Sequence, residues 1–294
     1  MNFGAEFENY NEQIFVLPLD NSINQLVLGE GKGTGQIYIG LERWGTKSLI
    51  GTLYPSNAKS KEFLSLYAKH FNCIELNSTH YGVPEESVVK EWTSKVPNDF
   101  IFCPKYLQSI THSSLRDADQ FTEPFMNGLL HFGKKLGPIF LQFPESVRPG
   151  SFSKKLLDYL QSLRKSYPAQ QFFIELRHPE WFEPNIWNPF TKQLKELQVG
   201  LVITDTPAIR YVLHMTLTIP AVMIRFVCLG NHPQDAIRID EWREKLEAWK
   251  QQGLERAFIF LHIQDEPQIA SYAKKVQQLF GIDNSVNNTP TTLF

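Results

Sequence analysis

This sequence has few cysteines and no long apolar runs. The first bears on the redox compartment of the protein, and the second on whether it crosses a membrane. Cys73, Cys103 and Cys228 are odd in number and far apart, and no CxxC spacing occurs, which fits a reducing compartment. No stretch approaches the roughly 20 apolar residues of a membrane span, and the N-terminus has no basic start followed by an apolar core. We therefore expect a cytoplasmic protein without a membrane partner.

A strong charge of one sign is also missing. The 29 Lys and Arg residues and 31 Asp and Glu residues leave a formal charge of −2. No global attraction to nucleic acid or to an anionic membrane is expected from it, although a local basic patch is compatible with that value. With 294 residues, 42% of them hydrophobic and 20% charged, the chain suits a soluble protein of one large α/β domain or two ordinary ones. Its 22 phenylalanines favour aromatic packing in the core and in any cleft.

Strand-like and helix-like segments alternate from Gln36 onward, which is typical of parallel strands joined by right-handed helical crossovers. The expected strands are 36–40, 73–76, 100–104, 138–143, 172–174, 201–204, 221–226 and 257–261. The expected helices are 60–71, 84–92, 119–136, 153–167, 184–199, 240–252 and 267–280. This pattern ranks a closed (β/α)8 TIM barrel above an open doubly wound sheet. The weak link is 206–220, where Pro207 and Pro220 allow at most a short helix.

One domain is the simplest organisation, because residues 36–283 contain no repeat, low-complexity block or Pro/Ser-rich linker. Residues 1–35 are polar and rich in asparagine and predict a loosely ordered N-terminal arm, and residues 284–294 predict a frayed C-terminal tail. The arm ends in glycines at 29, 31, 33 and 35. They do not predict a phosphate-binding loop, because such a loop follows a strand and ends in a Lys-Ser/Thr pair.

The stretch 172–182, FFIELRHPEWF, carries the strongest signal of a site. An apolar run of buried-strand character breaks into Glu175, Arg177 and His178. Because the carboxyl ends of barrel strands carry the working side chains, we expect these three residues around one pocket mouth. The alternative is a salt bridge between Glu175 and Arg177 that only stabilises the strand end.

Polar residues end nearly all of the other expected strands as well. Burying so many beside a barrel mouth would cost several kcal/mol of desolvation unless they satisfied one another. Function is therefore the more economical explanation, and a mutually satisfied structural network is the alternative. The residues at these strand ends are Glu75, Lys105, Gln142, Glu175, Asp205, Arg225 and His262.

Several longer strings belong together: LYP at 53–55, FNCIELNSTHYGVP at 71–84, PKYLQSITH at 104–112, LGPIFLQFP at 136–144 and IELRHPEWF at 174–182. In these strings, and over about 36–281, the chain resembles the YecE-like family (domain of unknown function 72), a large group of bacterial and archaeal proteins. The resemblance implies a TIM barrel and brings no established reaction. It also implies a polar cluster, formed by Glu75, Asn77, Tyr81, Lys105, His112, Gln142, Glu175, Arg177, His178, Trp181, Asp205 and Arg225.

The chain departs from the family pattern in three places. The first loop reads GLERWG at 40–45 and keeps only Trp44 of the family's run. The seventh strand ends in RFVCLGN at 225–231, and the eighth in LHIQDEP at 261–267. The side of the pocket built by strands seven, eight and one is therefore expected to be altered or to have lost its original role.

A glycosidase and a metal enzyme both fit these residues incompletely. Glu175 and Asp205 would supply a carboxylate pair about 5 Å apart. Glycosidase barrels, however, usually carry their acid and nucleophile on strands four and seven, where this chain has Gln142 and Arg225.

A divalent metal, Mn²⁺ or Zn²⁺, would use carboxylates and imidazoles as ligands, but no paired-histidine spacing supports such a site. The alternative for each histidine is a hydrogen-bonded position in a loop. The candidate ligands are Glu75, His112, Glu175, His178, Asp205 and His262.

A cationic mouth favours an anionic ligand, because guanidinium and ammonium groups bind phosphate and carboxylate. Aromatic rings there would stack on a nucleotide, a sugar phosphate or a nucleic-acid segment, unless they only anchor loops. The first hypothesis is a hydrolase or lyase that uses general acid/base chemistry. The second is a non-catalytic binding module for nucleic acid or an anionic metabolite.

The residues assigned to these roles are as follows. The expected catalytic residues are Glu175, Glu75, His112, His178 and Asp205. The expected substrate-binding residues are Trp44, Asn77, Tyr81, Lys105, Gln142, Arg177, Trp181 and Arg225. No cofactor is established, a divalent metal is compatible with the sequence, and the oligomeric state is not predicted.

Overall fold

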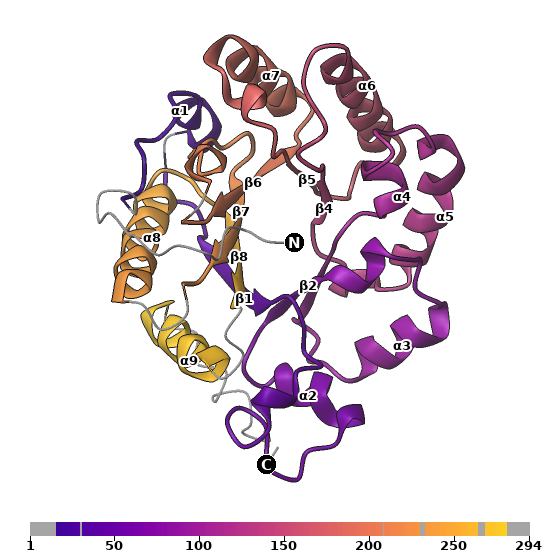
Figure 1. Ribbon diagram of the computed structural model, residues 1–294, viewed down its shortest axis with the longest axis vertical. Coiled ribbons are helices and arrows are strands. Elements are labelled where there is room, and N and C mark those ends of the chain that lie inside the picture. Colours follow the sequence, from indigo (N-terminus) through magenta and orange to yellow (C-terminus); the bar gives the residue numbers. More distant parts are fainter. Residues whose placement is uncertain (1–15, 30, 208, 230–232, 264–267, 281–294) are drawn as a thin grey trace.

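The computed structural model describes residues 16–29, 31–207, 209–229, 233–263 and 268–280. Within these ranges parallel strands form a ring and helices surround it, which is the predicted α/β architecture of TIM-barrel type (Figure 1). The strands are β1 (Gln36–Leu41), β2 (Cys73–Leu76), β3 (Ile101–Pro104), β4 (Ile139–Gln142), β5 (Phe172–Glu175), β6 (Gly200–Asp205), β7 (Ala221–Val227) and β8 (Arg256–His262).

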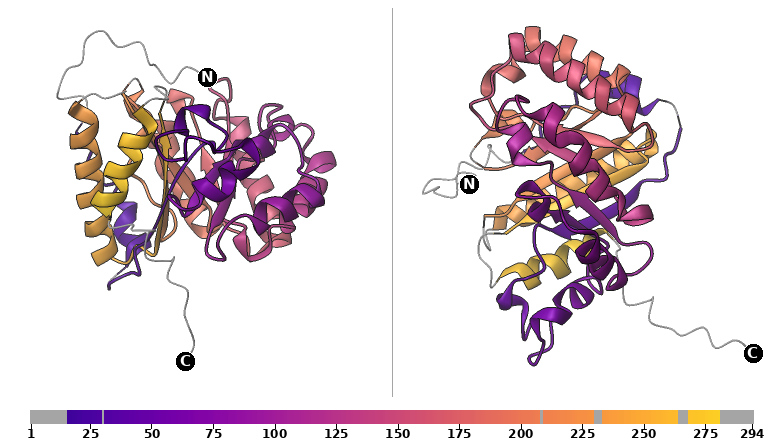
Figure 2. Two further views of the ribbon diagram at one scale, coloured as in Figure 1. Left: turned by 90° about the horizontal axis from the view of Figure 1, so that it is seen from below. Right: turned by 90° about the vertical axis from the view of Figure 1, so that its right-hand side faces the viewer.

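Helix α1 precedes β1, and the other helices lie between or after the strands along the chain. They are α1 (Ile23–Leu28), α2 (Phe63–Tyr67), α3 (Glu86–Ser94), α4 (Gln108–Thr111), α5 (Ala118–Leu130), α6 (Ser151–Ser166), α7 (Pro184–Glu196), α8 (Pro233–Gln251) and α9 (Ile269–Phe280). The last two lie side by side on one flank of the strands (Figure 2). None of the helices in the described ranges has the length and apolar content needed to cross a membrane.

Backbone ladders join the strands in the order β1-β8-β7-β6-β5-β4, and β2 and β3 form a second ladder. The β3 and β4 segments meet through isolated parallel bridges, one of them between Lys105 and Phe140. Side chains join β1 to β2: Ile39 N donates to Asn72 Oδ1 at 2.8 Å and Leu41 N donates to the Tyr67 hydroxyl at 2.7 Å. The junction is tight, since a Cβ on Gly40 would stand 2.3 Å from the backbone of the next strand.

Strand residues alternate between two hydrophobic cores, as the period of two in a β-strand requires. One core lies between the strands and the surrounding helices. The other fills the inside of the ring, where Tyr38 stacks on Phe258 with ring centroids 4.8 Å apart. Its buried members are Cys73, Cys103, Phe140, Phe173, Val202, Ile219, Ala221, Met223, Phe258 and Phe260.

Some helix boundaries differ from those predicted. The predicted helix 119–136 ends at Leu130 and continues as a separate 3₁₀ turn, Gly133–Lys135. The last helix before β8 starts at Pro233, one to two turns before residue 240. Its first buried positions are Asp235 and Arg238, so the apolar period that marks a helix is missing there. Between β6 and β7, where at most a short helix was predicted, the described chain contains a 3₁₀ turn, Arg210–Val212.

Residues 16–29 and 31–35 of the predicted arm are ordered instead, because they pack on the barrel. Asn24 of α1 is buried, donates to Met215 O at 2.9 Å and accepts from Leu217 N at 2.8 Å. Asp20 accepts hydrogen bonds from Lys245 and Trp249 of α8. The first half of the arm and the predicted tail 284–294 lie outside the described residues.

Candidate functional site

A layer of polar side chains lies directly above the inner core, at the carboxyl ends of the strands. Each member stands two residues after an inner-core residue and therefore faces the same interior. We call this set the polar layer: Glu75, Lys105, Gln142, Glu175, Thr204, Arg225 and His262, all of them buried.

Arg225 is the centre of the polar layer. Its Nε and Nη2 donate to both carboxylate oxygens of Glu75, at 3.1 and 3.0 Å. Its Nη1 donates to both oxygens of Glu175, at 3.2 and 2.9 Å. Below it, the ring of Phe140 lies 5.7 Å from the guanidinium carbon. One guanidinium thus joins strands β2, β5 and β7 through hydrogen bonds to two ionised carboxylates, which is the strong, charge-assisted type.

Further donors surround the two carboxylates. Arg177 donates through Nε and Nη2 to Glu175 Oε1, at 3.0 and 2.9 Å, and Thr204 Oγ1 donates to the same oxygen at 3.1 Å. Asn77 Nδ2 donates to Glu75 Oε1 at 3.0 Å. The predicted residues Glu75, Asn77, Glu175, Arg177 and Arg225 are therefore brought together.

The surrounding positive charges keep both carboxylates ionised. Burial alone would raise the pKa of Glu175, but Arg177 and Arg225 together lower it to about 2. Burial acts on Glu75 in the same way, and Arg225 followed by His262 holds the pKa of Glu75 well below its ordinary value. Neither group carries a proton to donate near neutral pH.

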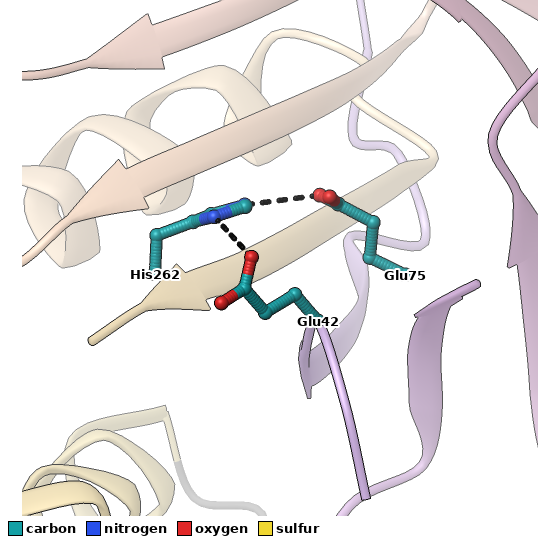
Figure 3. Close-up of side chains that lie close together, drawn as sticks. All are labelled: Glu42, Glu75 and His262. Carbon is teal, nitrogen blue, oxygen red and sulfur yellow. Dashed lines mark hydrogen bonds and ion pairs between the residues drawn. The ribbon is translucent and has the colours of Figure 1, made fainter. Parts of the chain in front are cut away.

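His262 lies between two carboxylates (Figure 3). Its Nε2 is 3.1 Å from Glu75 Oε2 and its Nδ1 is 3.0 Å from Glu42 Oε2. Burial acts to lower the pKa of His262, but the Glu75 charge outweighs it, and the pKa is raised above its ordinary value. With an acceptor at each ring nitrogen, the geometry suits a doubly protonated imidazolium.

The same three residues are the described group whose geometry could hold a metal ion, with ligand atoms within 4.8 Å of one another. Of the metal ligands predicted from the sequence, this group contains Glu75 and His262. Their chemistry fits a proton better than a divalent cation, because Arg225 already binds both oxygens of Glu75 and a protonated imidazole has no lone pair for a metal.

Lys105 follows β3 and is the least neutralised charge of the polar layer. Its side chain is 6% exposed, and its ammonium makes no hydrogen bond or ion pair with any described residue. The backbone is held firmly, with N donating to Leu76 O at 3.1 Å and O accepting from Thr79 Oγ1 at 2.8 Å. Burial, and then the charge of Arg225, lowers the pKa of Lys105 to about 8.

Two histidines border Lys105. The exposed His112 and the buried His80 have ring centroids 5.0 Å apart. Burial, followed by the charge of Lys105, lowers the pKa of His112, and the same causes lower that of His80 to about 4. His80 Nδ1 lies 2.7 Å from Tyr106 O and therefore carries the proton, which leaves Nε2 as an acceptor. Both rings are neutral at pH 7.

Asp205 does not join the polar layer, although the sequence predicted it as a catalytic residue. It follows the inward-facing Thr204 and therefore points outward to α8. There its carboxylate pairs with Arg238 at 3.0 Å and with Arg210 at 2.8 Å, and accepts from Trp242 Nε1 at 2.9 Å. The structure gives Asp205 a structural position between β6 and α8.

Asp205→Asn is therefore expected to lower stability by about 2 kcal/mol, because the fully buried Arg238 loses part of its compensating charge. Urea denaturation measures this change. Ligand binding at the polar layer is expected to stay within twofold of the unsubstituted protein. A change in binding larger than tenfold at unchanged stability would instead restore Asp205 as a site residue.

Two other residues that were predicted to belong to the site, Trp181 and His178, are buried and hydrogen-bonded within the protein. Trp181 is fully buried and its Nε1 donates to Val147 O at 2.9 Å, so it has no face open to a ligand. His178 is buried too, and its Nδ1 accepts from Glu180 N at 3.2 Å, which caps a 3₁₀ turn. Both follow β5 at the point where the chain turns outward.

The remaining predicted aromatics, Trp44 and Tyr81, are not members of the polar layer. Trp44 packs edge-on against Trp92 of α3, with centroids 5.4 Å apart. Tyr81 is 73% exposed and meets His80 edge-on at 5.3 Å. Of the predicted stacking residues discussed, Tyr81 has the open face. Gln142 is buried in the polar layer, in register with Glu175.

Sequence reasoning missed Glu42, His80 and Thr204 as members of this region. Glu42 lies inside the GLERWG loop and contacts His262, so two of the three departures from the family pattern meet in space. Thr204 follows Val202 by two residues and so shares its inward face, but the apolar Leu201 and Ile203 on the other face give no sequence signal of which set points inward. No signal in the sequence distinguishes His80 from an ordinary loop histidine.

Comparison with known proteins places the chain in a family. The family model described as "Protein of unknown function DUF72" matches residues 38–293. UPF0759 protein YecE of Escherichia coli strain K12 is 27% identical over 252 residues, which cover 79% of this chain and 88% of that protein. UPF0759 protein YunF of Bacillus subtilis strain 168 is 25% identical over 281 residues, with 85% and 96% covered.

Solved structures agree on the fold. A DUF72 family protein of Enterococcus faecalis V583 superposes with a TM-score of 0.65 at 22% identity, covering 84% of this chain and 98% of that one. D-psicose 3-epimerase of Clostridium cellulolyticum H10, solved with D-tagatose, has a TM-score of 0.51 at 10% identity, with 85% and 99% covered. At these identities the likeness concerns the fold alone. The family match covers most of the sequence, and the chain belongs to the DUF72 family.

Proposed function

We propose that the protein is a hydrolase or lyase that binds a small phosphorylated or otherwise anionic substrate at the polar layer and acts by general acid/base chemistry. The observation that carries this proposal is the buried ammonium of Lys105, which has no partner among the described residues. A buried cation left in this state is costly unless a ligand completes it. A phosphate or carboxylate is the group that would do so.

The other charges support distinct roles. Glu75 and Glu175 are held ionised, so they fix the guanidinium groups and contribute a negative field. Arg177 lies close enough to Lys105 for its charge to lower the pKa of that lysine, and it adds positive charge that favours an anion there. His112 is neutral and exposed beside them, which suits a group that accepts a proton from bound substrate.

A thermal-shift screen with inorganic phosphate, sugar phosphates, 2-oxo acids and nucleotides tests the proposal. A ligand present at about 100 times its dissociation constant adds about 2.7 kcal/mol of stability. We expect at least one anionic class to produce such a shift, and Lys105→Met to abolish it. Lys154→Met is the matched control, because that lysine is 81% exposed on α6 and should leave the shift unchanged. No shift from any class, or an equal shift in Lys105→Met, would refute the proposal.

A binding module for nucleic acid is the second candidate. The exposed ring of Tyr81 favours it, because this ring contacts His80, which lies next to Lys105. A single-stranded oligonucleotide added to the screen separates the two. Binding to it that weakens steeply with salt, and that Glu175→Gln leaves equal or stronger, supports the module. Turnover of a bound small molecule that Glu175→Gln abolishes supports the enzyme.

A further inference from the structure

Lys105 differs from the neighbouring cations because its charge is not permanent near neutral pH and no described residue pairs with its ammonium. Arg177 and Arg225 are guanidinium groups that keep their charge and are already bound to carboxylates. Lys105 is an amine that burial and a neighbouring cation push toward the free base. These are the two ways in which proteins activate a lysine as a nucleophile.

The surroundings of Lys105 match that use. Its own strand places it two residues after Cys103, directly above the apolar inner core, so little water reaches the amine. Its main chain is held by Leu76 and Thr79, which fixes the root of the side chain. The groups facing it are Arg225, Arg177, Glu75, Glu175, His80 and His112.

We infer that Lys105 is a nucleophile that forms an imine with the carbonyl carbon of an anionic aldehyde or ketone. This inference rests on the proposed function, since the same mouth must bind the substrate's phosphate or carboxylate. It names the substrate class that the proposed function leaves open. It also favours the lyase over the hydrolase.

The step balances without any added oxidant or reductant. The Nζ lone pair forms a bond to the carbonyl carbon, while the π electrons move to the oxygen, which takes up a proton. The nitrogen of this carbinolamine loses a proton, and the hydroxyl group leaves as water after a second protonation. One amine, one carbonyl and one proton thus give one protonated imine and one water.

The protonated imine draws electrons from the neighbouring carbon, which makes loss of a proton or cleavage of a carbon–carbon bond possible there. The base for that proton must be unprotonated at neutral pH and lie close to Lys105. His112 meets both conditions, because the charge of Lys105 adds to burial in keeping its ring unprotonated. Glu175, with a pKa of about 2, is a weaker base.

Trapping of the imine by sodium borohydride tests the inference. The probe is pyridoxal 5′-phosphate, which carries an aldehyde and a phosphate. Hydride from borohydride reduces the imine to a stable secondary amine, and mass spectrometry of the peptides locates it.

At pH 7 a lysine with a pKa of about 8 has roughly 200 times more free amine than one at the ordinary value, although its lower basicity makes it a weaker nucleophile. We expect Lys105 to be labelled at least about tenfold faster than Lys154, with a rate that rises through pH 8.

The controls separate chemistry from folding. Lys105→Met is expected to lose the label and to melt at an equal or higher temperature, because it removes an unpaired buried charge. Lys105→Arg keeps a cation, retains anion binding in the thermal-shift screen and gives no adduct. Labelling spread over surface lysines with none at Lys105, in a protein that still binds phosphate compounds, overturns this inference and leaves the proposed function standing.

The reverse result is also decisive. Pyridoxal, which lacks the phosphate, is expected to label Lys105 at least about tenfold more slowly than its phosphate ester, and inorganic phosphate is expected to slow the ester. Equal labelling by both aldehydes, with no effect of phosphate, keeps the nucleophile and removes the anion site on which the proposed function depends.

Discussion

Arg225→Met is expected to lower the free energy of unfolding by about 5 kcal/mol, the largest effect of any single substitution considered. The guanidinium binds both oxygens of Glu75 and both of Glu175, and all three side chains are at most 3% exposed. Removing it leaves two carboxylates buried with much of their compensation gone, and breaking one buried pair already costs 3–5 kcal/mol as a rough rule. Urea denaturation at pH 7 measures the loss.

Two further variants serve as controls for Arg225→Met: a matched arginine substitution on the surface, and a second substitution that should restore part of the lost stability. Arg148→Met removes a guanidinium whose pair with Glu180 is 67% and 46% exposed, and should cost less than about 1 kcal/mol. Adding Glu175→Gln to Arg225→Met removes one stranded charge and should recover part of the stability. An Arg225→Met protein that is as stable as Arg148→Met would show that the centre of the polar layer is not compensated as the geometry indicates.

Acidification is expected to destabilise the protein strongly below pH 5. The folded state lowers the pKa of Glu175 to about 2, against about 4.3 in an unfolded chain. A depressed carboxyl pKa contributes stability that is complete above the unfolded value and disappears as the pH falls through the folded value. By linkage, Glu175 alone accounts for about 3 kcal/mol between pH 5 and pH 2, and Glu75 adds to it in the same direction.

Glu175→Gln should flatten this pH dependence by about 3 kcal/mol when unfolding is measured at pH 5, 4, 3 and 2. Thr204→Val is the conservative comparison, since it removes one hydrogen bond from the same carboxylate and no charge. Its effect on the pH dependence should stay below about 1 kcal/mol. If Glu175→Gln and the unsubstituted protein show the same slope, the acid sensitivity has another source.

Much of the ring could be predicted because strands and helices differ in their apolar period. Buried strands such as β5 and β7 read as apolar runs, and a charged residue stands in each: Glu175 ends β5, and Arg225 interrupts the run of β7. That is why Glu75, Lys105, Glu175 and Arg225 were expected at a common mouth, and the structure does bring them together. The start of helix α8 was predicted too late, because the first buried residues of this helix, Asp235 and Arg238, are charged and not apolar.

The features that could not be predicted depend on which way a side chain points and on which distant segment it contacts. Asp205 and Thr204 are adjacent, and which of them faces inward depends on the phase of the strand, which composition does not reveal. Trp181 resembles a stacking residue in sequence and is a core residue in space. Glu42 gains its position only because β1 and β8, the first and last strands, lie side by side.

That neighbourhood bears on the order in which the ring can be assembled. Gln36 pairs with Arg256 and Leu41 with Leu261, so among the described strands the backbone ladder of β1 requires β8. On the ribosome, β1 emerges first and must wait for nearly the whole chain before it finds that ladder. Until then the edge of β1 that faces β8 has no backbone partner, because the side chains of Asn72 and Tyr67 accept hydrogen bonds from Ile39 N and Leu41 N on the opposite edge. An unpaired strand edge is a site of wrong association, so β1 is expected to be exposed to it until synthesis is almost complete.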